Sequence, residues 1–192
     1  MTALARASAH PDFGLIRMTE SKYLDAEAAS PVKHEYFNGI VEAMAGANER
    51  HEIVALNLAT LIHAHLRGKR CRVFKSDMKL RVTTDDKVVH FYPDIMVTCD
   101  RKDTHPIYKE KPTLIIEVAS DDWERDYYMK LAAYLPIPSL LEYVVVWPDK
   151  KKASVTIFRP TTGLKPAAVH KKGSFTLESI GLTIALNEVY RE

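Results

Sequence analysis

The pattern of apolar and polar residues divides the chain into helical and extended segments. Between residues 48 and 66, apolar residues such as Leu58, Leu61 and Ile62 recur at three- and four-residue spacing, which predicts an amphipathic helix that Gly68 closes. Short apolar runs at residues 72–82, 88–97, 113–118 and 142–147 instead indicate strands, and the more continuous ones are typical of strands buried on both faces of a sheet. The two patterns together predict a mixed α/β protein.

Shorter signals complete the list of expected elements. Residues 19–28 predict a short helix with Thr19 as its N-cap, and Asn38-Gly39 between two apolar runs predicts a hairpin over residues 34–44. Residues 122–134 predict a second long helix, which Pro136 ends. We expect residues 99–111 to form a polar loop and residues 154–159 and 174–177 to pair as a closing hairpin.

The order of these elements predicts the fold class. It reads helix, hairpin, helix, three strands, helix, strand and hairpin, which fits a central mixed β-sheet flanked by helices, in the α/β (α+β) class. The strand–helix–strand unit over residues 113–147 is expected to be a parallel crossover. Residues 1–18 are expected to be a flexible N-terminus, and residues 19–192 a single domain with an N-terminal helix-hairpin and a C-terminal hairpin.

The amino-acid composition indicates the cellular compartment of the protein more clearly than its function. The net charge of +2 permits nucleic-acid binding but does not indicate it. Cys71 and Cys99 are the two cysteines, without a C-x-x-C motif, so we expect neither a disulfide framework nor a structural zinc site and favour a reducing cytoplasmic environment. Because no apolar run approaches the ~20 residues that a membrane-spanning helix needs, we expect no membrane partner.

The candidate chemistry begins with two carboxylates beside apolar strands. Asp94 directly precedes I-M-V, and Glu117 directly follows L-I-I. An unpaired buried carboxylate costs several kcal/mol, so such residues are usually paired, protonated or bound to a metal. On neighbouring strands they would repel each other unless a cation lay between them, and hard oxygen ligands favour Mg²⁺ or Mn²⁺. The alternative is that both lie at strand ends, exposed or salt-bridged, without a function.

A series of short motifs follows a fixed order from about residue 19 to the end of the chain. They are Glu35 and Gly39 in H-E-Y-F-N-G, His51 before the long helix, Asp77 and Lys79 in S-D-M-K-L-R-V, Tyr92-Pro93-Asp94, Glu117 in I-I-E-V-A-S, then Asp126, Lys130 and Tyr134 in D-Y-Y-M-K-L-A-A-Y, and Glu142-Tyr143. In this order and spacing they resemble the PD-(D/E)xK nucleases, and among these the bacterial Uma-type family of restriction-endonuclease-like proteins.

This resemblance implies a restriction-endonuclease-like core and metal-dependent hydrolysis of phosphodiester bonds in DNA. Asp94, Glu117 and the backbone carbonyl of Val118 would hold Mg²⁺ or Mn²⁺. The alternative is a catalytically inactive nuclease fold that binds nucleic acid or a protein partner, and a third hypothesis is hydrolysis of another phosphate ester on the same scaffold. A homodimer is a further expectation, with an apolar contact at residues 136–141 or in the last hairpin.

One departure from the superfamily pattern concerns its lysine. The superfamily places a lysine two residues after the glutamate, where this chain has Ala119. Lys130, in the following helix, is the first candidate to replace it, because the family's D-x-x-x-K spacing recurs there. Lys79 is the second, since its side chain could face the site from an adjacent strand.

Two further residues are candidates for the same catalytic site. Glu35 is either an extra acidic ligand from an early segment or a surface glutamate on an exposed hairpin. His51, at the N-terminus of the long helix, is either a base or phosphate contact or simply a capping or packing residue.

Overall fold

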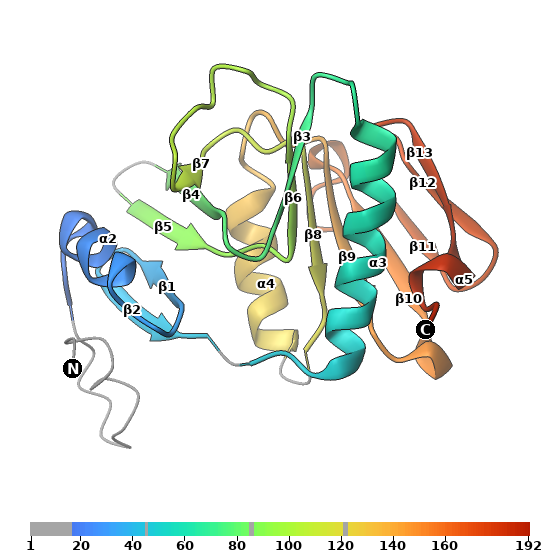
Figure 1. Ribbon diagram of the computed structural model, residues 1–192, viewed down its shortest axis with the longest axis horizontal. Coiled ribbons are helices and arrows are strands. Elements are labelled where there is room, and N and C mark those ends of the chain that lie inside the picture. Colours follow the sequence, from blue (N-terminus) through green and yellow to red (C-terminus); the bar gives the residue numbers. More distant parts are fainter. Residues whose placement is uncertain (1–16, 45, 85–86, 121–122) are drawn as a thin grey trace. The chain divides into compact units, whose positions relative to one another are not determined.

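The computed structural model describes residues 17–44, 46–84, 87–120 and 123–192, with side chains omitted for 123–126. The chain forms two compact units, one comprising residues 1–46 and 81–92 and the other residues 47–80 and 93–192. Figure 1 labels their helices and strands. The expected flexible N-terminus lies outside the described residues up to residue 16; Arg17 already forms a β-bridge with Ile40.

The first unit contains the expected helix and hairpin. Helix α2 (Glu20–Ala28) begins after Thr19, whose hydroxyl accepts a hydrogen bond from the Lys22 amide. Strands β1 (His34–Phe37) and β2 (Ile40–Ala43) are joined at Asn38 and Gly39, whose φ angles of 47° and 106° suit a tight hairpin turn. Strand β5 (Lys87–Phe91) pairs with β1, and residues 81–84 of β4 (Lys79–Thr84) complete this unit.

Buried and half-buried polar groups hold α2 against these strands. Glu27 accepts hydrogen bonds from the His34 amide at 2.9 Å and from the Tyr92 hydroxyl at 2.7 Å. Glu20 contacts the guanidinium of Arg81 at 2.6 Å and the imidazole of His90 at 2.7 Å. Each of these carboxylates therefore has hydrogen-bonding partners that compensate for its lost hydration.

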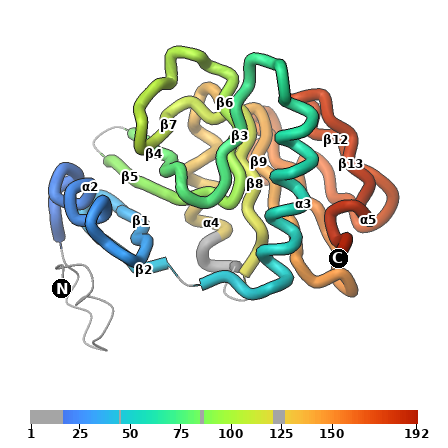
Figure 2. The backbone as a smooth tube through the Cα atoms, viewed as in Figure 1, coloured from blue at the N-terminus to red at the C-terminus, as the bar shows by residue number. Residues whose placement is uncertain are grey.

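The second unit is built on a six-stranded mixed sheet, visible in Figure 2 as the layer behind α3 (Glu49–Leu66). The parallel pairing of β8 and β9 confirms the expected crossover through α4 (Trp123–Tyr134). In spatial order the strands are β11 (Ala168–His170), β10 (Ser154–Phe158), β9 (Glu142–Trp147), β8 (Leu114–Val118), β6 (Ile95–Thr98) and β3 (Arg72–Lys75).

The two long helices cover opposite faces of this sheet. Along β8, Ile116 and Val118 pack into the hydrophobic core that includes Leu58 and Ile62 of α3. Because successive side chains of a strand point to opposite faces, Glu117 faces the other side. There it accepts a hydrogen bond from Tyr134 of α4.

The C-terminal segments pack on α3. Strands β12 (Ser174–Leu177) and β13 (Leu182–Ala185) form a hairpin that leads into α5 (Leu186–Val189). The Asn57 side chain donates hydrogen bonds to the carbonyls of Val189 and Arg191, which tie the chain end to α3. Two 3₁₀ turns, η1 (Lys150–Lys152) and η2 (Pro160–Thr162), flank β10.

The structure confirms the α/β class but divides the strands among three sheets. In the structure, each of the two longest predicted strands is divided into two shorter strands. Residues 72–82 break into β3 and β4 near Ser76, which has a φ of 57°, and residues 88–97 break into β5 and β6 at Pro93. Both positions interrupt a ladder, since Ser76 is left-handed and proline has no N–H to donate.

Two predictions about pairing were wrong. The expected hairpin between residues 154–159 and 174–177 does not form, because β10 pairs with β9 and β11 while β12 pairs with β13. The expected polar loop over residues 99–111 contains β7 (Tyr108–Lys109), which pairs in parallel with Lys79 and Leu80 at the start of β4. Short strands with few apolar residues give little periodic signal.

The expectation about the cysteines was also wrong. Cys71 and Cys99 form a disulfide, with their Cα atoms 4.1 Å apart. The antiparallel register of β3 and β6 pairs Arg72 with Thr98, so the next residues outward are the two cysteines. This proximity depends on strand register, which the separation of 28 residues in sequence conceals. In the part of the chain that the structure describes, no helix has the length and apolar character to cross a membrane.

Candidate active site

Strand register brings the two predicted carboxylates together. In the antiparallel pair β6–β8, Ile95 lies opposite Ile116. Continuing this register by one residue sets Asp94 opposite Glu117. Directly opposite residues of an antiparallel pair share a face of the sheet, with Cβ atoms about 5 Å apart.

Asp94 is held by a backbone amide and an imidazole. Its Oδ2 accepts a hydrogen bond from the Val118 amide at 2.8 Å and lies 3.1 Å from Nε2 of His51. His51 is placed in the first turn of α3 by Asn48, whose side chain accepts from the His51 amide at 3.0 Å. The hydrogen bond to Asp94 raises the pKa of His51 above its ordinary value, against the opposing effect of burial.

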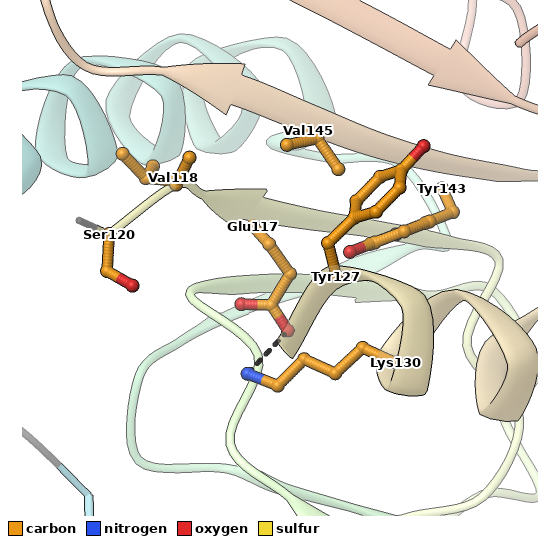
Figure 3. A pocket seen from close by; sticks show the side chains of 8 residues that line it. Glu117, Val118, Ser120, Tyr127, Lys130, Tyr143 and Val145 are labelled. Atoms are coloured by element: carbon orange, nitrogen blue, oxygen red, sulfur yellow. Dashed lines mark ion pairs between the residues drawn. The ribbon is translucent and has the colours of Figure 1, made fainter. Parts of the chain in front are cut away.

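The Glu117 carboxylate is held by two side chains of α4. Its Oε1 accepts a hydrogen bond from the Tyr134 hydroxyl at 2.9 Å and lies 3.4 Å from Nζ of Lys130. Figure 3 shows the Lys130 side chain reaching back along the helix so that its nitrogen points at this carboxylate. Lys130 and Tyr134 are four residues apart and therefore lie on one face of α4. The side chains of Glu117 and Lys130 are 11% and 10% exposed, so their ion pair is largely shielded from water.

A small cavity lies beside this ion pair. Its volume is about 40 Å³, and Glu117, Ser120, Tyr127, Lys130 and Tyr143 are among the residues that line it. A water molecule needs roughly 10–15 Å³ of such space, so the cavity has room for a few small ligands. The cavity beside this carboxylate and ammonium is therefore large enough for a water molecule or a phosphate oxygen.

The donor set suits a hard divalent cation. Asp94 and Glu117 offer carboxylate oxygens, although the described residues contain no group of three or more His, Cys, Asp or Glu side chains placed to hold a metal. Mg²⁺ is commonly held by one or two carboxylates, with water and substrate phosphate completing its shell. Two opposed carboxylates fit that pattern, and the Val118 carbonyl stays a prediction as a further ligand.

The first candidate lysine, Lys130, contacts Glu117 with its ammonium nitrogen. Lys79 begins β4, is buried, and pairs in register with Tyr108 of β7. Glu35 lies on β1 in the first unit and is only 8% exposed, so the alternative of a surface glutamate on an exposed hairpin is wrong. The Asp126 side chain lies outside the described residues.

Two contacts of the site were not anticipated from the sequence. Tyr134 belongs to the motif series but had no predicted role, and its hydroxyl donates a hydrogen bond to Glu117. The Val118 amide donates a hydrogen bond to the Asp94 carboxylate. The i, i+4 spacing of Lys130 and Tyr134 was the available signal for the first contact, whereas a backbone amide leaves no signal in a sequence.

Known proteins resemble the chain over almost its whole length. A family described as "putative restriction endonuclease", Uma2, matches residues 21–187. The chain belongs to the Uma2 family. An uncharacterized protein of Synechocystis sp. is 30% identical over 179 residues, which cover 91% of this chain and 92% of the relative. A second uncharacterized Synechocystis protein is 30% identical over 133 residues, covering 67% of this chain and 74% of the relative.

A solved structure shares the fold of this Uma2 protein. The crystal structure of a "putative nuclease" from Anabaena variabilis superposes with a TM-score of 0.67, covering 87% of this chain and 96% of the other. At 17% sequence identity, this likeness concerns the fold alone. The family and the fold together support a nuclease-like function.

Proposed function

We propose that this Uma2 protein is a metal-dependent endonuclease that hydrolyses phosphodiester bonds in DNA. The observation that carries the proposal is the ion pair between Lys130 and Glu117. The superfamily has a lysine two residues after this glutamate, where the chain has Ala119, and the ion pair brings another ammonium to the same carboxylate. Membership of the Uma2 family supports the nuclease class. Mg²⁺ or Mn²⁺, DNA and the residue roles are parts of this proposal.

In this proposal, Asp94 and Glu117 bind the cation, together with the Val118 carbonyl. When bound, a divalent cation lowers the pKa of a coordinated water and offsets negative charge on the phosphate. Lys130, which lines the same cavity as Glu117, stabilises charge on the attacking water or the phosphate. An ammonium fixed in a shielded site is worth more than in water because it needs no reorganisation during the reaction.

His51 and Tyr134 act in this proposal through the carboxylates that they contact. The His51 imidazole orients Asp94 together with the Val118 amide. The Tyr134 hydroxyl orients Glu117. Such partners keep metal-binding carboxylates in a fixed orientation, and their loss weakens metal binding or activity.

A catalytically silent nuclease fold is the second candidate function, and Ala119 is the observation that favours it. Plasmid cleavage distinguishes the two. With Mg²⁺ or Mn²⁺, we expect the wild type to nick and linearise supercoiled plasmid, while Glu117→Ala and wild type in EDTA leave it intact. No cleavage by the wild type with either metal, while DNA is still bound, would establish the silent binding module instead.

A further inference from the structure

A groove lies between α3 and the edge strand β3 of the second unit. Its volume is about 480 Å³, and its walls include His63 and Arg67 from α3 and Val73, Phe74 and Lys75 from β3. β3 is the terminal strand of the six-stranded sheet, and α3 runs beside it in Figure 1. We call this feature the α3–β3 groove.

Both walls of the α3–β3 groove lead to Asp94. On the strand wall, Lys75 lies opposite Ile95, and the amide of the next residue, Ser76, donates a hydrogen bond to the Asp94 carbonyl at 3.1 Å. On the helix wall, the first turn of α3 contacts the Asp94 carboxylate through His51. A ligand lying in the groove would therefore extend from the candidate active site.

The charge of the groove suits an anion. Its ionisable lining residues are His63, Arg67 and Lys75, and no carboxylate is among the described residues that line it. Lys75 lies 3.3 Å from Glu52, whose side chain is 55% exposed. Because such an exposed ion pair is weak and screened, a phosphate can replace Glu52 as the partner of Lys75.

The aromatic wall of the groove does not indicate base recognition. Arg72 and Lys109 lie 5.8 and 5.6 Å from the centroid of the Phe74 ring. The ring thus already interacts with two cations, and the groove offers charge rather than an unoccupied stacking surface. A ligand recognised in this way would be a polyanion bound without regard to base sequence.

We propose that the α3–β3 groove binds the phosphate backbone of DNA on one side of the phosphate that the site cuts, with Arg67 and Lys75 as its cationic contacts. This inference rests on the proposed function, since it assigns the path of that function's substrate. It also predicts how binding responds to salt, because each neutralised phosphate releases counterions.

The test is DNA binding in EDTA, where no cleavage occurs. Fluorescence anisotropy of a labelled duplex of mixed sequence gives the affinity at several salt concentrations for wild type, Arg67→Ala/Lys75→Ala and Lys171→Ala. Lys171 is the matched control because it is exposed and follows β11, at the opposite edge of the sheet from β3. Arg67→Gln/Lys75→Gln, which keeps polar side chains of similar reach, replaces the alanine variant if circular dichroism shows that the latter is unfolded.

We expect the double variant to bind more weakly at low salt and its salt slope to fall by about 2, close to one for each phosphate that the removed cations neutralise in the wild type. Lys171→Ala should match the wild type. Equal slopes for the double variant and Lys171→Ala, or no binding by the wild type at low salt, would overturn the groove assignment. So would a β3-mediated dimer that the double variant disrupts without a change in DNA affinity.

Failure of the groove and failure of the proposed function give different results. If the wild type cleaves plasmid but the double variant has an unchanged salt slope, the nuclease assignment holds and the groove assignment fails. If the salt slope of the double variant falls by about 2 but the wild type does not cleave with either metal, the groove holds and the catalytic assignment fails.

Discussion

At the scale of residues, the candidate site is defined by contacts between side chains, and a sequence motif does not specify these contacts. Asp94 and Glu117 were identifiable from the sequence because each carboxylate adjoins an apolar run. Lys130 was one of two candidates, and its contact with Glu117 depends on the packing of α4 against the sheet. No rule of sequence spacing defines that packing, so this contact could not be predicted from the sequence.

The contact between His51 and Asp94 gives a direct prediction for the metal-free protein. The pKa of His51 is raised by its hydrogen bond to Asp94, so Asp94→Asn should lower it toward the ordinary value. A raised histidine pKa stabilises the fold fully below the unfolded value of 6.5, and this stabilisation is lost as the pH rises through the folded pKa.

NMR titration of the imidazole C–H resonances measures this effect. The control is Asp100→Asn, which removes a carboxylate that contacts Lys111. An unchanged His51 titration in Asp94→Asn would show that the two side chains are not in contact in solution.

At the scale of elements, the sequence indicated most helices and strands but not where strands change sheets. The 3.6-residue pattern of α3, the Asn38-Gly39 turn and the apolar run of β9 are local signals, and each predicted element is present. The breaks at Ser76 and Pro93 separate strands that pair with distant partners. Such pairing depends on contacts between residues far apart in sequence, and the local pattern of apolar residues does not reveal them.

The disulfide should contribute measurably to the stability of the second unit. Cys71 and Cys99 close a segment of 28 residues that contains β3 and β6. By loop-closure entropy, a crosslink of this length stabilises by about 3–4 kcal/mol. Reduction with dithiothreitol should therefore lower the Tm of the wild type, and Cys71→Ala/Cys99→Ala should show the lower Tm with or without the reductant. Equal Tm values for oxidised and reduced wild type would contradict this expectation.

The first unit should lose stability in acid through Glu20. Hydrogen bonding to Arg81, and then to His90, lowers the pKa of Glu20 below 4.5, against the opposing effect of desolvation. A lowered carboxyl pKa gives stabilisation that is present above 4.5 and is lost as the pH falls through the folded pKa.

Urea unfolding at pH 7 and in the acid range measures this loss as a change in the free energy of unfolding. The unfolding is followed by a spectroscopic signal from the first unit. Glu20→Gln should be less stable than wild type at neutral pH, and the difference should shrink in acid. Asp25→Asn, on the same helix, is the control. A difference that stays constant with pH would rule out the proposed ion pair as its source.

At the scale of the whole molecule, family, fold class and the carboxylate pair follow from the order of motifs along the chain. The disulfide, the division into three sheets and the α3–β3 groove do not, because each arises from register or from packing between elements. The contact between the Lys130 ammonium and Glu117 also arises from packing between elements. The nuclease proposal depends on it, since Ala119 stands where the superfamily has lysine.

The most direct test is therefore a relocation of that lysine. Ala119 lines the same cavity as Glu117 and Lys130, so a lysine at either position would reach the same space. With Mg²⁺ and plasmid DNA, we expect Lys130→Ala to cleave about 10²–10³-fold more slowly than wild type, as for loss of one charge-stabilising donor. Lys130→Ala/Ala119→Lys should recover much of that rate, and circular dichroism should show both variants folded. Cleavage by Lys130→Ala at the wild-type rate would contradict the assignment of Lys130 as the relocated lysine of this site.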